Sequence, residues 1–125
     1  MNIFVTGGCG YKGTVLVPKL LKRGYQVQVL DTQWFGNYLP KHRNLKNYRM
    51  NLSDISKIKD KKFNAVIHLA SIANDPMAEL DKNLSWETSA LNTFKLMNFI
   101  KKNKIRKIIY ASSGSVYGIK KEKKV

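Results

Sequence analysis

The stretch Thr6-Gly7-Gly8-Cys9-Gly10-Tyr11-Lys12-Gly13 decides the fold of this 125-residue chain. It follows a short apolar run, Ile3-Phe4-Val5, and precedes a segment of helical periodicity that extends to Arg23. Glycines spaced as Gly7-x-x-Gly10-x-x-Gly13, after a strand and at the start of a helix, fit a dinucleotide-binding loop. Small residues there let a pyrophosphate approach the helix N-terminus, whose N–H groups attract anions. The stretch therefore predicts a strand–loop–helix unit that binds a dinucleotide.

Asp31 supplies the second half of this pattern, because it ends the next apolar run, Val27–Leu30. Its carboxylate can accept hydrogen bonds from ribose hydroxyls, and its charge repels a 2′-phosphate, which favours NAD over NADP. A glycine turn without a ligand is the alternative. Lys12 either reaches toward the cofactor phosphates or is a solvated surface lysine. Cys9 has no neighbouring His or acid in the sequence, so we expect a packing residue rather than a nucleophile.

Short apolar runs alternate with longer amphipathic ones along the rest of the chain. We expect strands at residues 3–5, 27–30, 48–52, 65–70 and 105–111, and helices at residues 11–23, 53–59 and 84–102. Gly24 is expected to end the first helix and Ser53 to cap the second. In the third, apolar residues recur at helical spacing and are expected to pack; they are Trp86, Leu91, Phe94, Met97 and Ile100. Apolar strands separated by helices predict an α/β fold, a doubly wound parallel sheet of Rossmann type with about five strands, covered on both faces.

The composition indicates a folded domain with a large positive charge. Hydrophobic residues make up 43% of the chain, which is too many for a disordered polycation. Lys and Arg number 23 against 8 Asp and Glu, a net charge of +15, so a basic nucleic-acid-binding domain is an alternative. Most of these cations are Lys rather than Arg, which argues against specific recognition. No apolar run is long enough for a membrane span, and a single cysteine favours the reducing cytoplasm.

Five stretches carry a further pattern. They are Val5-Thr6-Gly7-Gly8-Cys9-Gly10-Tyr11-Lys12-Gly13, Val29-Leu30-Asp31, Asn51-Leu52-Ser53-Asp54, Val66-Ile67-His68-Leu69-Ala70-Ser71 and Tyr110-Ala111-Ser112-Ser113-Gly114-Ser115-Val116-Tyr117-Gly118. In this order they resemble the extended short-chain dehydrogenase/reductase family, specifically its NAD-dependent nucleotide-sugar epimerase/dehydratase branch. The resemblance spans nearly all of the chain, and the first and last stretches are the most specific.

The resemblance implies roles for individual residues. The pyrophosphate loop would comprise Gly7, Gly10, Tyr11, Lys12 and Gly13, and Asp31 would hold the adenosine ribose. Asn51 and Leu52 would meet the adenine ring, Leu69, Ala70 and Ser71 would pass the middle of the cofactor, and Ser113 would be the catalytic serine. His68 falls at an ordinary strand position and is expected to be a core residue. No metal site is implied.

Two departures from the family pattern narrow the expected activity. The 4,6-dehydratases carry an acidic pair where this chain has Gly114 and Ser115, which leaves epimerases and reductases. The family's Tyr-x-x-x-Lys pair lies on a helix well beyond Ser113. Tyr117 and Lys121 have that spacing, but Tyr117 matches the tyrosine of the family's Ser-Val-Tyr-Gly ending. Tyr117 is therefore not expected to be the catalytic tyrosine.

Residues 1–125 are therefore expected to be the NAD-binding, N-terminal part of a longer domain, with the sheet incomplete at its C-terminal side. The complete form would act on a nucleotide sugar and could be a homodimer. A non-catalytic NAD-binding module is the alternative. The isolated chain is expected to associate through the sheet edge left uncovered.

Overall fold

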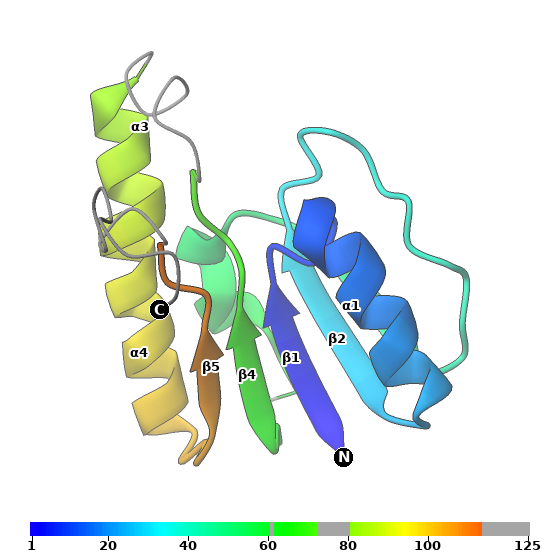
Figure 1. Cartoon of the computed structure of the whole chain (residues 1–125). Helices are drawn as coiled ribbons and strands as arrows, with labels where there is room; N and C mark the ends of the chain where they lie inside the picture. The colour runs from blue at the N-terminus through cyan, green and yellow to red at the C-terminus, as the bar shows by residue number, and fades with distance from the viewer. Residues whose placement is uncertain (61, 73–80, 114–125) are drawn as a thin grey trace, which may run out of the picture.

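The computed structural model describes residues 1–60, 62–72 and 81–113 and shows one twisted, all-parallel sheet (Figure 1). Its strands are β1 (Asn2–Thr6), β2 (Gln26–Asp31), β3 (Leu45–Arg49), β4 (Ala65–His68) and β5 (Ile108–Tyr110). Their spatial order is β3-β2-β1-β4-β5. Because this is the strand order of a Rossmann fold, the predicted fold class is confirmed.

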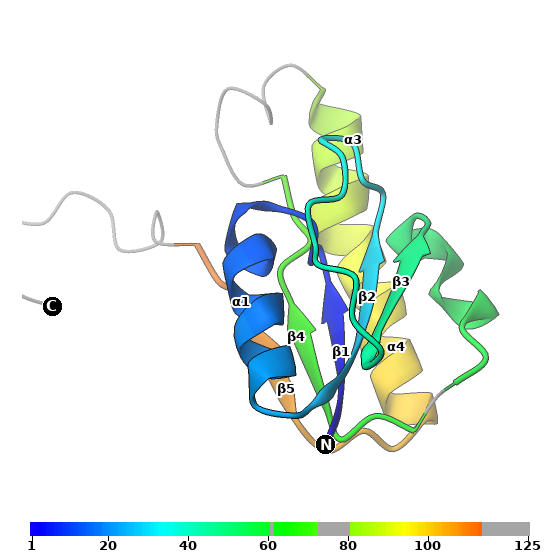
Figure 2. The same ribbon diagram turned by 90° about the vertical axis from the view of Figure 1, so that its right-hand side faces the viewer.

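Helices cover the sheet from both sides (Figure 2). Helix α1 (Tyr11–Lys22) lies on one face, over β1 and β2. The 3-10 helix η1 (Leu52–Lys57) and the long helix lie on the other, and the long helix comprises α3 (Lys82–Trp86), the π-helical turn η2 (Glu87–Leu91) and α4 (Asn92–Lys102). The two layers give the doubly wound arrangement that the alternating pattern predicts.

The core divides into two clusters because successive strand residues point to opposite faces. Phe4 packs toward α4, where its ring stacks on Phe63 at 4.8 Å between centroids and lies 6.1 Å from Phe99. Val5, the next residue, packs with Val17 of α1 on the other face. These clusters fix the ends of β1, β2 and β4, from which the loops of the candidate site emerge.

Helix α1 ends as the sequence predicts. Gly24 has a φ of +78°, its N–H donates to Leu21 O at 2.9 Å, and the N–H of Tyr25 donates to Leu20 O at 3.2 Å. These two bonds are a Schellman motif, which needs one residue in the left-handed conformation. Glycine adopts this conformation without steric cost.

Two sequence predictions about helices are wrong. The expected apolar face at residues 84–102 does not pack as a unit: Trp86 is 65% and Phe94 70% exposed, whereas Leu96 and Phe99 are buried. Within α4 the buried residues are Asn92, Leu96 and Phe99, and Phe94, two residues before Leu96, lies about 200° away from it around the helix and so on the opposite face. Helix η1 is capped by Asn51 rather than Ser53, since Asn51 Oδ1 accepts from the Ser53 N–H at 2.9 Å.

Strands β3 and β5 also depart from the expectation. Strand β3 occupies residues 45–49 instead of 48–52, because the chain turns away after Arg49 to begin η1. All three residues of β5 are exposed, including Ile109 at 60%, so the expected cover on both faces is wrong for this strand within the described residues. Among those same residues, no helix is long and apolar enough to cross a membrane.

Candidate functional site

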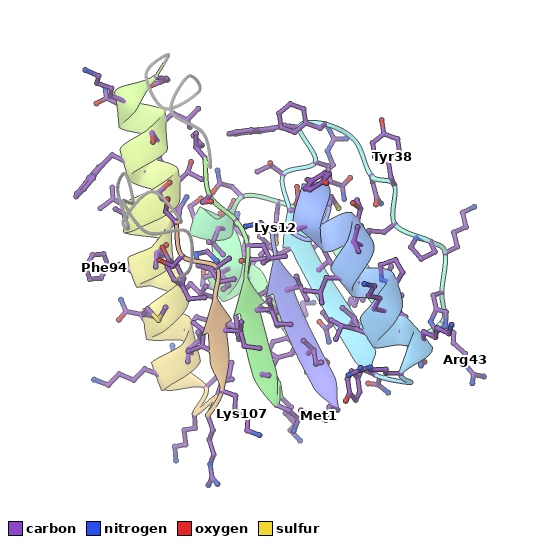
Figure 3. The ribbon with its side chains drawn as sticks, in the orientation of Figure 1. Met1, Lys12, Tyr38, Arg43, Phe94 and Lys107 are labelled. Carbon is purple, nitrogen blue, oxygen red and sulfur yellow. The ribbon has the colours of Figure 1, made fainter. Side chains whose placement is uncertain are left out.

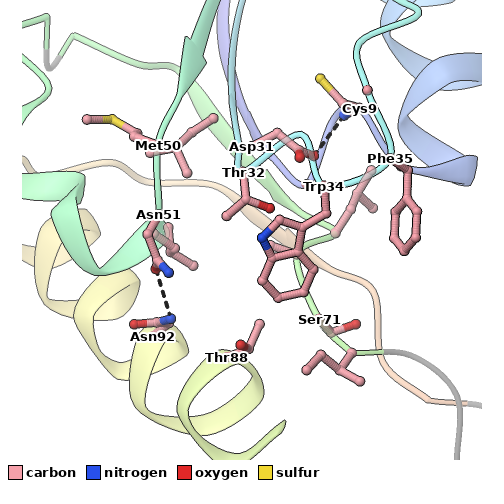
Figure 4. A pocket seen from close by; sticks show the side chains of 18 residues that line it. Cys9, Asp31, Thr32, Trp34, Phe35, Met50, Asn51, Ser71, Thr88 and Asn92 are labelled. Carbon is pink, nitrogen blue, oxygen red and sulfur yellow. Dashed lines mark hydrogen bonds between the residues drawn. The ribbon is translucent and has the colours of Figure 1, made fainter. Parts of the chain in front are cut away.

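An open pocket lies at the carboxyl ends of β1, β2 and β4 (Figure 4). Its lining residues are Gly7, Cys9, Gly10, Leu30, Asp31, Thr32, Trp34, Phe35, Gly36, Met50, Asn51, Leu52, Leu69, Ala70, Ser71, Ile72, Thr88 and Asn92. Ligands of open parallel sheets bind at this edge, where loops from neighbouring strands converge. The fold therefore brings together segments that are far apart in the sequence.

The glycine loop forms one wall by lying directly against the loop after β4. A Cβ on Gly7, whose φ is +72°, would stand 2.5 Å from Ala70 N. A Cβ on Gly13 would stand 2.2 Å from Gly8 O, so the first turn of α1 packs on the backbone of the loop itself. At Gly10 the nearest atom to an added Cβ is Gly7 O at 3.4 Å, an ordinary contact. Gly7 and Gly13 are thus required by the packing of the protein, and Gly10 is not.

The N-terminus of α1 presents backbone donors next to this wall. Gly10 is the N-cap residue, and within the described chain no side chain caps the helix and no acidic residue lies in its first turn. Helix geometry leaves the first amides, those of Tyr11, Lys12 and Gly13, without intrahelical acceptors. The helix end can therefore bind an anion through its N–H groups and its dipole.

Asp31, at the end of β2, connects two loops of the pocket. Its Oδ2 accepts a hydrogen bond from Cys9 N at 2.9 Å, and its Oδ1 accepts one from Gln33 N at 2.6 Å. A carboxylate offers about four lone-pair positions, so each oxygen can accept one more hydrogen bond. The side chain can thus hold both loops in place and still accept hydroxyl donors from a ligand.

Asn51 and Asn92 form a polar pair on the opposite wall. Asn51 Oδ1 accepts from Ser53 N at 2.9 Å and from Asn92 Nδ2 at 3.3 Å. Because a backbone N–H can only donate, the first bond fixes the orientation of the Asn51 amide and the second fixes that of Asn92. Asn51 Nδ2 is then left as a donor on the pocket side (Figure 4). Asn92, 1% exposed, keeps an Oδ1 without a hydrogen-bond partner in the described part of the chain.

Two titratable side chains near the pocket have perturbed pKa values. Burial raises the pKa of the Cys9 thiol, helped by the charge of Asp31 and opposed by a hydrogen bond from Asn47. Burial lowers the pKa of His68, whose Nδ1 lies 2.5 Å from Thr6 Oγ1 and whose Nε2 lies 3.1 Å from Thr93 Oγ1. Both are buried packing residues, as the sequence predicts.

Most of the predicted cofactor residues meet in this pocket, and some do not. Gly7, Gly10, Asp31, Asn51, Leu52, Leu69, Ala70 and Ser71 line it; Tyr11, Lys12, Gly13 and Ser113 do not. Tyr11 and Lys12 are exposed at the start of α1, with Lys12 at the carboxyl edge of the sheet (Figure 3), and Gly13 is buried beneath the loop. Ser113 is exposed, three residues after β5. Gly114, Ser115, Tyr117 and Lys121 lie outside the described residues.

Sequence reasoning missed several lining residues, namely Thr32, Trp34, Phe35, Gly36, Met50, Ile72, Thr88 and Asn92. Most lie in loops without periodicity. The one available signal was the pair of neighbouring aromatic residues, Trp34 and Phe35, close behind Asp31 in a polar loop.

Comparison with known proteins identifies the family of the chain. The profile of the NAD dependent epimerase/dehydratase family matches residues 3–125. The chain belongs to this family. The UDP-glucose 4-epimerase of Lactobacillus helveticus is 29% identical over 126 residues, covering 98% of the chain and 38% of that protein. The chain thus spans well under half the length of this epimerase/dehydratase relative.

Solved structures of other proteins agree with the fold. UDP-glucose 4-epimerase from Thermotoga maritima, solved with UDP-glucose, is 28% identical with a TM-score of 0.82, covering 92% of this chain and 38% of that one. The Bordetella bronchiseptica enzyme WbmF, solved with NAD⁺, is 26% identical with a TM-score of 0.82, covering 91% and 36%.

NAD, the cofactor of the family, suits the donors and acceptors found in this pocket. Uncapped helix amides are matched to a pyrophosphate, and a carboxylate with spare lone pairs is matched to ribose hydroxyls. Gly10 keeps the backbone between them free of a side chain, and the nearest atom to an added Cβ there is Gly7 O at 3.4 Å.

Proposed function

We propose that residues 1–125 are the cofactor-binding part of a nucleotide-sugar epimerase or reductase and bind NAD at the carboxyl edge of β1, β2 and β4. One observation carries the proposal. The uncapped N-terminus of α1 and the Asp31 carboxylate flank one pocket. N–H groups that can donate to a pyrophosphate therefore lie on one side, and a carboxylate that can accept from ribose hydroxyls lies on the other. The family match and the NAD⁺ complex of WbmF support the same cofactor.

Different residues of the site bind different parts of the cofactor. The amides of Tyr11 to Gly13 hold the pyrophosphate, with Lys12 adding positive charge from the exposed side of α1. Asp31 holds the adenosine ribose and repels a 2′-phosphate, which selects NAD over NADP. Asn51 and Leu52 border the base, and Leu69, Ala70 and Ser71 border the middle of the cofactor.

NAD, when bound, accepts and returns a hydride at a sugar carbon. Ser113, which lies just beyond β5, is proposed to hydrogen-bond the reacting sugar oxygen and orient it. We therefore propose that residues 1–125 supply the cofactor-binding part of this reaction. Substrates of the kind named for the relatives, UDP-sugars, belong to this proposal.

The test is calorimetric titration of the full 125-residue chain with NAD and with NADP. We expect saturable binding of NAD with one site per chain and weaker binding of NADP. Absence of NAD binding by a folded chain, together with tight, salt-sensitive binding of DNA, would favour the nucleic-acid alternative.

A further inference from the structure

Two neighbouring aromatic side chains stand at the tip of the first turn after β2. The Gly36 N–H donates to Gln33 O at 3.0 Å, so residues 33–36 form a tight turn with Trp34 and Phe35 at its centre. Trp34 is 52% and Phe35 is 72% exposed. Large aromatic side chains usually bury most of their surface, so two adjacent exposed rings beside a pocket indicate a ligand contact.

The turn is held from below by the same carboxylate that stands in the candidate site. Gln33 has a φ of +58°, a conformation that costs an ordinary residue about 1 kcal/mol or more. Its N–H donates to Asp31 Oδ1 at 2.6 Å, and its Nε2 donates to Asn47 Oδ1 at 3.2 Å. These bonds offset the strain and fix the position of the turn relative to Asp31. The position of Trp34 is therefore set by the hydrogen bonds of Gln33 to Asp31 and Asn47 rather than by packing in the core.

The two rings differ in where they point. Trp34 and Phe35 both line the pocket, but in Figure 4 the indole of Trp34 extends toward Asn51 and Asn92, whereas the ring of Phe35 lies on the far side of the turn. The wall facing the indole holds Met50 and Asn51, and the free donor Asn51 Nδ2 belongs to it. One flat apolar surface and one N–H donor thus border the same space.

We propose that Trp34 is the stacking surface for the adenine ring of the dinucleotide, with Asn51 Nδ2 donating to a ring nitrogen of that base. The inference rests on the proposed NAD site, because the assignment of Asp31 to the adenosine ribose makes adenine, rather than nicotinamide, the ring next to Trp34. Adenine offers a π face and unprotonated ring nitrogens, which suit an indole and an amide donor. Stacking of a base on an aromatic side chain contributes about tenfold to affinity.

The chain allows a direct optical test because it contains two tryptophans, Trp34 in the pocket and Trp86 on the exposed surface of α3. In the Trp86→Phe variant, emission reports on Trp34 alone. We expect NAD⁺ and ADP, which share adenine, to change this emission, and nicotinamide mononucleotide to leave it unchanged. In the matched Trp34→Phe variant, which reports on Trp86, none of the three should change the emission.

Affinity provides the second readout. Trp34→Ala should weaken binding of NAD⁺ and of ADP by the same factor of about ten, while Trp86→Ala leaves both unchanged. Thermal melting should change little for either variant, because both side chains are more than half exposed.

Weakened binding of NAD⁺ without weakened binding of ADP would place a different ring at Trp34 and overturn the proposal. NAD⁺ binding with unchanged Trp34 emission would also overturn it, while leaving the proposed function intact. Absence of NAD⁺ binding to the folded wild-type chain would instead refute the proposed function.

Discussion

The glycines of the loop should separate into those that the fold requires and one that the ligand requires. We consider three alanine variants, at Gly13, Gly10 and Gly24. A Cβ on Gly13 would lie 2.2 Å from Gly8 O and 2.4 Å from Gly8 C, so backbone atoms must move by close to 1 Å. Forced overpacking of this kind costs about 3 kcal/mol. For a chain of this size, that loss corresponds to a melting temperature lower by about 10 °C.

Gly10→Ala should behave in the opposite way. Its φ of −77° suits alanine, and the added Cβ meets only Gly7 O at 3.4 Å, so stability should change by less than about 0.5 kcal/mol. The same Cβ would stand at the pocket wall where the backbone must approach the pyrophosphate. Loss of one hydrogen bond to a charged group weakens affinity about tenfold or more, so NAD binding should fall while the fold persists.

Gly24→Ala is the control, because Gly24 lies at the far end of α1 from the pocket and has open space around it. Only its φ of +78° opposes alanine, at a cost of about 1 kcal/mol. The order of the three variants by stability, from circular dichroism melting, should therefore differ from their order by NAD affinity, from calorimetric titration. Stability should be lowest for Gly13→Ala, and affinity among the folded variants should be lowest for Gly10→Ala. Wild-type melting of Gly13→Ala, or wild-type affinity of Gly10→Ala, would refute the reasoning.

Three further predictions follow from the structure. Because burial lowers the pKa of His68 below 6.5, the unfolded chain binds a proton that the folded chain does not. Stability should therefore decline as pH falls below about 6.5, by at most about 1.4 kcal/mol per pH unit. Urea titrations should show a flatter dependence of stability on pH for His68→Asn, and an equally steep dependence in that variant would contradict this reasoning. Ile109→Lys, on the exposed strand β5, should reduce self-association in sedimentation, whereas Val15→Lys on the outer face of α1 should not; a wild-type chain that is monomeric at all concentrations would contradict this. Lys12→Ile should weaken NAD binding and reduce its salt dependence, and unchanged affinity would assign Lys12 to the solvated surface.

The sequence predicted those parts of the molecule whose cause is local. The glycine loop, the end of α1 at Gly24 and the acid at the end of β2 each depend on a few neighbouring residues, and the structure has them where they were expected. Their convergence at one pocket follows from parallel strands, whose carboxyl ends meet at one edge.

The remainder depends on contacts that no local pattern contains. Trp86 and Phe94 were expected to pack, but the face of the helix that packs against the sheet holds Leu96 and Phe99 instead, and the π turn at 87–91 has no sequence signal that periodicity detects. Trp34 lies in an aperiodic loop whose position is set by bonds to Asp31 and Asn47. Burial of Asn92 beside Asn51 joins residues far apart in the chain.

The central claim is that NAD binds at the carboxyl edge of β1, β2 and β4. Its most direct test is a map of backbone amide chemical shifts in the full chain during titration with NAD. The account predicts saturable shifts confined to the pocket and the start of α1, including Gly10, Asp31, Asn51 and Ala70, with little change along β5 or at the C-terminal end of α4. Shifts centred on α4 and β5, or a folded chain whose spectrum does not respond to NAD, would contradict it.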